Sequence, residues 1–64
     1  MDLIDYIGKK VYILTYDGDA YFGTVSDYFY PEENKEAKES IVVDTIDGRY
    51  IAFDEDDIRT IQIS

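Results

Sequence analysis

The densest group of chemically useful side chains in this sequence is the acidic run from Asp54 to Asp57. Clustered carboxylates are the ligands that Ca²⁺ and Mg²⁺ prefer, and a pair of them can serve a glycoside hydrolase. The run has neither the spacing nor the central glycine of an EF-hand loop. An aspartate followed by three acids is also typical of a capped helical turn with solvated carboxylates. We interpret the run as such a turn, and a divalent-cation site is the alternative.

The residue types that are missing restrict the chemistry further. The chain has 64 residues, with no cysteine and no histidine. These absences exclude disulfides, the usual zinc sites, histidine acid–base catalysis and a Ser-His-Asp triad. If so short a chain folds as a small barrel, its own side chains fill the interior and leave no substrate cleft. We therefore expect a protein that is not an enzyme and that uses no cofactor.

The charge of the chain disfavours nucleic acid as a partner. Fifteen acidic and six basic residues give a net charge of −9, which repels phosphate backbones at long range. The basic residues are scattered along the sequence. An RNA surface would require the fold or an oligomer to gather Lys9, Lys10, Arg49 and Arg59. Otherwise they are solvated strand-end charges and partners of neighbouring acids.

Aromatic residues are concentrated before the only proline. Tyr28, Phe29, Tyr30 and Pro31 could line a groove for a peptide, or stack on single-stranded bases. The structural alternative is that these aromatic rings close the open end of a small barrel and support a docked helix.

The spacing of apolar residues predicts five strands, and glycines mark where the chain turns. The strands are expected at residues 10–16, 19–29, 40–45, 49–53 and 59–63. Asp17-Gly18 and Asp47-Gly48 predict two-residue hairpin turns. Gly23, inside the second strand, indicates a sharp bend, a bulge or a close backbone approach. In the first strand both faces carry apolar groups, so both are expected to be at least partly covered.

The remaining segments connect these strands. Residues 2–8 predict a short helix capped by Asp2, with Gly8 at its end. Residues 30–39 form one long charged connection, either a helical turn that begins at Pro31 or a mobile loop. Asp54 caps a single 3₁₀-like turn. The sum is one all-β domain over residues 1–64, a strongly bent five-stranded SH3-like barrel with a short N-terminal helix.

The stretch "GKKVYILTYDGDAYFGTV" resembles the first motif of the Sm-like (LSm/Hfq-type) family of SH3-like barrels. The motif runs as alternating apolar residues, an Asp-Gly turn, an aromatic residue, a glycine and an aliphatic residue. The matching positions are Val11, Ile13, Asp17, Gly18, Tyr21, Gly23 and Val25. The resemblance covers residues 2–29, and residues 40–63 follow it by general pattern.

The resemblance implies assembly more than RNA binding. Sm-like barrels pair their fourth strand with the fifth strand of the next subunit, and residues 49–53 and 59–63 would take these places. RNA-binding members carry Asp and Asn after the second strand and an Arg-Gly signature later. Here the corresponding segments are "YFYPEENKEAKES" and Ile58-Arg59-Thr60, so the RNA-binding residues do not carry over. We expect a self-associating protein–protein interaction or assembly module; the alternative is a divergent Sm-like RNA binder.

The sequence also predicts a cellular location. Its apolar runs are too short to cross a bilayer, and its acidic start "MDLIDYIG" does not resemble a signal peptide. We therefore expect a cytoplasmic protein without a membrane contact.

Overall fold

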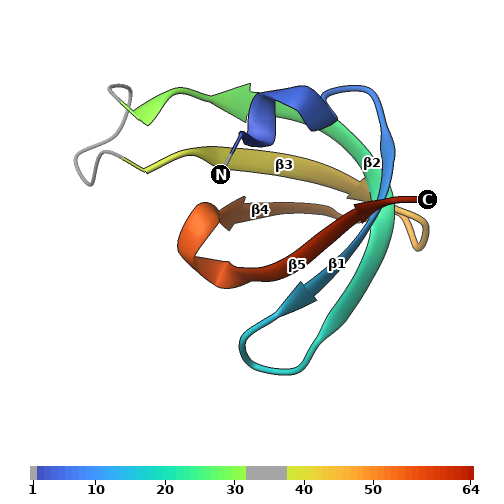
Figure 1. Ribbon diagram of the computed structural model, residues 1–64. Coiled ribbons are helices and arrows are strands. Elements are labelled where there is room, and N and C mark those ends of the chain that lie inside the picture. Colours follow the sequence, from blue (N-terminus) through green and yellow to red (C-terminus); the bar gives the residue numbers. More distant parts are fainter. Residues whose placement is uncertain (1, 32–37) are drawn as a thin grey trace.

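The computed structural model describes residues 2–31 and 38–64, and it contains the five strands that the sequence predicts (Figure 1). Each strand begins and ends within one residue of its expected position. The strands are β1 (Lys10–Thr15), β2 (Ala20–Phe29), β3 (Ser40–Thr45), β4 (Tyr50–Asp54) and β5 (Ile58–Ile63). Two short 3₁₀ helices, η1 (Leu3–Tyr6) and η3 (Glu55–Asp57), precede β1 and β5.

The strands form one antiparallel sheet in the order β4-β3-β2-β1-β5. The sheet is strongly bent, so that its inner face wraps around a single core, and β2 is the long curved strand that joins its two halves (Figure 1). This arrangement confirms the predicted all-β class. The core consists of Leu3, Val11, Ile13, Val25, Ile41, Val43, Phe53 and Ile58.

Gly23 lies where the backbones of β2 and β3 come close together. It is paired with Val11 on one side and with Thr45 on the other. A Cβ atom added at this glycine would stand 2.3 Å from the carbonyl oxygen of Asp44 and 2.8 Å from the Cα of Thr45. Both are backbone atoms, so only glycine permits the two strands to approach this closely. The glycine therefore marks a close backbone approach, and the β2 bulge lies further along the strand, between Val25 and Asp27.

The two hairpin turns differ from the prediction. The N–H of Gly18 donates to Thr15 C=O (3.0 Å), while the N–H of Thr15 donates to Asp19 C=O (2.9 Å). This is a three-residue loop with glycine in the left-handed region, at φ +90°. The turn around Asp47 and Gly48 has the same hydrogen bonds and a φ of +86°. The prediction of two-residue turns is therefore wrong. Thr15 pairs with Asp19, and Thr45 pairs with Arg49, so each loop contains one residue before its Asp-Gly pair.

The N-terminal helix is also shorter and less regular than expected. It is a 3₁₀ turn over Leu3–Tyr6, and Asp2 makes no side-chain capping hydrogen bond, so the prediction of an Asp2 cap is wrong. Leu3 is fully buried and attaches the turn to the core. Gly8 ends the segment at φ +78°, and its N–H donates to Val25 C=O on β2 (2.8 Å). Burial of one leucine and this strand contact hold the turn, since four residues have no helical stability of their own.

The outer face of β1 is only partly covered. Val11, Ile13 and Thr15 are buried, as their alternation predicts, while Tyr12 and Leu14 on the opposite face are half-buried. None of the helices described has the length and apolar character needed to cross a bilayer. Of the predicted 30–39 connection, residues 32–37 lie outside the described residues.

Candidate functional site

The predicted acidic run forms η3, and most of its carboxylates have structural partners. The N–H of Asp54 donates to Asp57 Oδ2 (3.0 Å), and Ser40 Oγ donates to Asp54 Oδ1 (2.7 Å). Lys38 Nζ lies 2.6 Å from Asp56 Oδ2. In residues 2–31 and 38–64, no three acidic side chains converge in a geometry for a metal ion. The geometry is that of the capped turn, and it connects β4 to β5.

The aromatic segment that was a candidate partner surface is divided between core and surface. Tyr28 is half-buried against the core, and its hydroxyl donates to Glu39 Oε1 (2.8 Å). The same oxygen accepts the N–H of Leu3 (3.3 Å), so Glu39 connects η1 to β2. Phe29 and Tyr30 stay largely exposed, and Tyr30 stacks edge-on against the Tyr28 ring (5.1 Å between centroids). Tyr28 thus supports the docked helix, which the sequence offered as the structural alternative.

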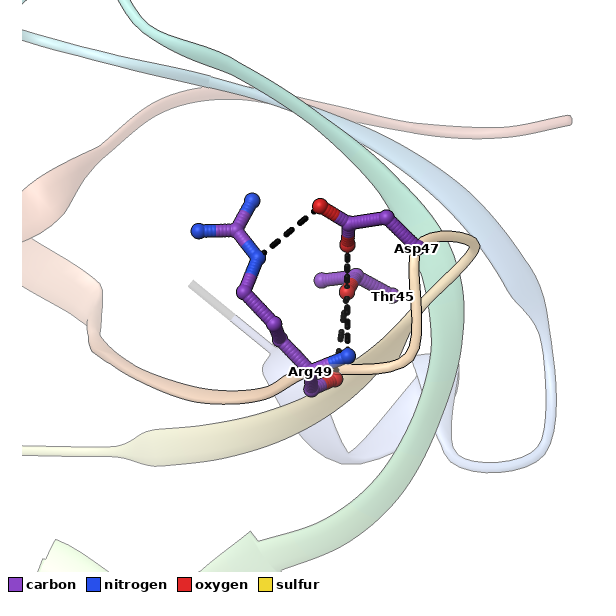
Figure 2. A network of polar contacts seen from close by, with 3 residues as sticks. All are labelled: Thr45, Asp47 and Arg49. Carbon is purple, nitrogen blue, oxygen red and sulfur yellow. Dashed lines mark hydrogen bonds and ion pairs between the residues drawn. The ribbon is translucent and has the colours of Figure 1, made fainter.

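The second hairpin carries a polar network that sequence reasoning did not foresee (Figure 2). The Thr45 hydroxyl is hydrogen-bonded to the Asp47 carboxylate and also lies within reach of Arg49 C=O (3.1 Å) and N–H (3.0 Å). Arg49 Nε pairs with Asp47 Oδ2 at 3.0 Å. These bonds from Thr45, and then from Arg49, lower the pKa of Asp47 below its usual 3.8. The network connects Asp47 and Arg49, on either side of Gly48, to Thr45 at the end of β3.

The four basic residues of the RNA hypothesis are not gathered in one place. Lys9 and Lys10 lie at the start of β1, beside Ser64 at the end of β5. Arg59 lies at the start of β5, opposite the end of β1, so about 13–16 Å of strand separates it from Lys10, and Lys9 is one residue further away. Arg49 is at the same end of the sheet as Lys10, but it is paired with Asp47. Within one chain, the described residues form no continuous basic surface from these four.

β4 and β5 are the two edge strands of the sheet. They are also the strands for which the sequence predicted self-association. No strand in the described part of the chain pairs with the outer side of β4 or of β5. An unpaired edge presents a row of backbone donors and acceptors that can pair with another chain. Neither strand contains a proline or a lysine that would block such pairing, and the bulge of β5 lies at its start, at Arg59.

Sequence reasoning missed a groove on the outer face of the sheet. Phe22 and Thr24 of β2, Lys10 of β1 and the end of β3 surround a hollow of about 390 Å³. Ile46, in the β3–β4 turn, is 82% exposed beside this hollow. One sequence feature could have indicated this groove. Ile46 takes the first position of a hairpin loop, where polar residues are more common.

Comparisons were made with protein-family models, with curated proteins and with solved structures, and none of the three gives a match to this chain.

Proposed function

We propose that this protein is a non-enzymatic assembly module that associates with copies of itself by pairing β4 of one chain with β5 of the next. The single observation that carries the proposal is the sheet order, which ends at these two strands and leaves one side of each unpaired in the described part of the chain. The affinity then comes mainly from backbone hydrogen bonds, as in other cases of strand addition.

The free edge of β4 can be assigned residue by residue. The N–H of Thr45 donates to Arg49 C=O (2.7 Å), so these two residues form a hydrogen-bonded pair of the β3–β4 ladder. Bonded and non-bonded pairs alternate in an antiparallel ladder. The backbone groups of Tyr50 and Ala52 therefore point away from β3, toward a second chain. The N–H of Asp54 is already used by Asp57, and this ends the free row.

The free edge of β5 follows in the same way. The N–H of Ser64 donates to Lys10 C=O (2.8 Å), which makes Gln62 the next residue bonded to β1. The backbone groups of Ile61 and Ile63 therefore point away from β1. Each edge offers two consecutive free residues of matching periodicity.

One antiparallel register satisfies both edges. It places Ala52 opposite Ile61 of the partner, and Tyr50 opposite Ile63 of the partner. Tyr50 and Ile63 are 72% and 58% exposed in the single chain, so this register covers two exposed apolar side chains. The next residues along this register are Asp54 and the partner's Arg59, which lies at the β5 bulge and carries the opposite charge. Because the two edges differ, the contact is head-to-tail and closes into a ring if the rotation permits.

The first test is the mass in solution by light scattering over a range of protein concentrations. We expect a multiple of the 7.4 kDa chain mass. Ala52→Pro removes one edge-facing N–H and leaves the β3–β4 ladder intact, because proline is tolerated where the N–H faces solvent. The variant should have a lower mass than the wild type, and Ala52→Ser, which keeps the N–H, should not. Equal masses for Ala52→Pro and the wild type, or a wild type that is monomeric throughout, would reject edge pairing.

RNA binding stays the alternative prediction. A ring could bring Lys9 and Lys10 of several chains onto one face, which the single chain does not do. Binding to single-stranded RNA that weakens steeply with salt would support this alternative. Protein contacts through apolar edges depend far less on ionic strength.

A further inference from the structure

The groove on the outer face of β2 has a distinct construction. We call it the β2 groove, and it is lined by Lys10, Phe22, Gly23, Thr24, Asp44, Thr45, Ile46 and Ser64. Residues of β2 form its floor. Because β2 lies between β1 and β3 in the sheet, Lys10 belongs to one wall while Asp44 and Ile46 belong to the other. A second, smaller hollow that Phe22 and Ile46 also line continues it toward Arg49.

The β2 groove exposes apolar surface that no described part of the chain covers. Ile46 is 82% exposed and Phe22 is 48% exposed. The Phe22 ring contacts Tyr12 of β1, with 4.9 Å between the centroids, so an apolar row runs from β1 across β2 to Ile46 in the β3–β4 turn. A contiguous exposed patch of this kind is typical of an interaction surface.

The β2 groove carries charged side chains of both signs. Lys10 is paired in register with Thr24, and Thr24 with Asp44, so one cation and one anion flank the floor about 10 Å apart. Neither Lys10 nor Asp44 forms an ion pair with another residue of the described chain. The charged side chains that line the groove therefore balance each other, in a chain of net charge −9. A surface of a single charge gains little there, whereas the groove of a second copy offers an anion to Lys10 and a cation to Asp44.

We propose that two copies of this chain associate through their β2 grooves, around a two-fold axis that lies in the interface parallel to β2. Such an axis exchanges the β1 and β3 sides, so that each Lys10 faces the partner's Asp44. Phe22 then meets its own equivalent, and Ile46 packs on the partner's Tyr12. The surface is self-complementary, as a two-fold contact requires. This contact uses the outer face of the sheet and leaves the edges of β4 and β5 free, so it does not depend on edge pairing.

The test is a charge swap, measured by sedimentation equilibrium. Lys10→Asp and Asp44→Lys each replace two attractive pairs with two repulsive ones, and each should raise the dimer Kd about tenfold or more. The double variant Lys10→Asp/Asp44→Lys restores opposite charges and should recover the wild-type Kd to within about threefold. Lys9→Asp is the matched control, because it changes the net charge equally but lies outside the groove. It should leave the affinity near that of the wild type.

An apolar variant provides an independent readout. Ile46→Asp should weaken the dimer roughly 10- to 100-fold, because it removes a side chain that the contact buries. Ile7→Asp, at an exposed isoleucine away from the groove, should not. Circular dichroism of each variant verifies the fold. The proposal is overturned if the double variant stays as weak as the single ones, if Lys9→Asp weakens association as much as Lys10→Asp, or if Ile46→Asp has no effect.

Measurement in the Ala52→Pro background separates the two contacts. If edge pairing and groove pairing both occur, Ala52→Pro forms dimers, and adding Lys10→Asp raises their Kd about tenfold or more. If edge pairing fails, Ala52→Pro has the wild-type mass, and Lys10→Asp still raises the dimer Kd about tenfold or more. A monomeric Ala52→Pro protein would exclude the groove contact.

Discussion

Replacement of Gly23 by alanine tests the central packing argument most directly. The added Cβ would lie 2.3 Å from Asp44 C=O, 2.7 Å from Val43 Cγ1 and 2.8 Å from Thr45 Cα. Carbon atoms in proteins pack at about 3.5–4.0 Å. Two of these three neighbours are backbone atoms of β3, which cannot rotate away, so the strands must move apart around Gly23.

The expected cost follows from two opposing terms. Overpacking of a well-packed site costs about 1–3 kcal/mol, and the backbone clash places this site at the upper end. Alanine restricts the unfolded chain and returns about 0.4–1 kcal/mol. We therefore expect Gly23→Ala to lower the free energy of unfolding by about 2 kcal/mol. For a domain of this size, that corresponds to a fall of about 8–16 °C in Tm.

The assay is urea unfolding followed by circular dichroism, with Gly18→Asn as the control. Gly18 has a positive φ, but a Cβ atom added there would meet nothing within 4 Å beyond its chain neighbours. Asparagine tolerates that backbone conformation, so this variant should cost less than about 1 kcal/mol. A Gly23→Ala protein whose stability lies within about 0.5 kcal/mol of the wild type would refute the close-approach argument.

Two further predictions concern the polar networks. Hydrogen bonds from Thr45 and Arg49 lower the pKa of Asp47 in the folded protein. The ionised carboxylate therefore stabilises the fold at any pH above about 3.8, which is the pKa of Asp47 in the unfolded chain. This stabilisation is lost as the pH falls through the lower pKa of the folded state. Asp47→Asn should therefore be less stable than the wild type at neutral pH. The difference between their urea midpoints should become smaller when the pH is well below 3.8. A difference that does not change with pH would contradict the pKa argument. Glu39→Ala removes the acceptor shared by Tyr28 and Leu3 and should cost about 1–2 kcal/mol, with faster amide exchange at Leu3. Glu39→Gln keeps an acceptor oxygen and should cost less, and equal losses for both variants would argue against a role of the hydrogen bonds.

Local patterns were sufficient to predict the strands and the turns. Alternating apolar residues such as Val11 and Ile13 identify a strand and its buried face, because side chains alternate across a strand whatever its partner is. The Asp-Gly pairs identify the hairpins because glycine adopts positive φ without a steric cost. The length of each loop was missed, since it depends on which residues pair across the hairpin. Thr15 pairs with Asp19, and this adds a residue to the loop.

The same limit applies to the candidate sites. The sequence indicated that Gly23 was structurally special, but only the neighbouring strand shows which of three explanations holds. Glu39 joins Leu3 to Tyr28 across 36 and 11 positions, a connection that no short motif encodes. Lys10 and Asp44 likewise meet at one groove because β2 lies between their strands.

Residue types and near-neighbour spacing are enough to establish the all-β class, the five strands, the turn positions and the absence of thiol and imidazole chemistry. The folded arrangement is needed to identify which strands are edges, which side chains form the β2 groove and that Arg59 lies apart from Lys9 and Lys10. These features arise from strand order and from the curl of the sheet. Both are set by contacts between residues distant in the chain, which local periodicity does not specify.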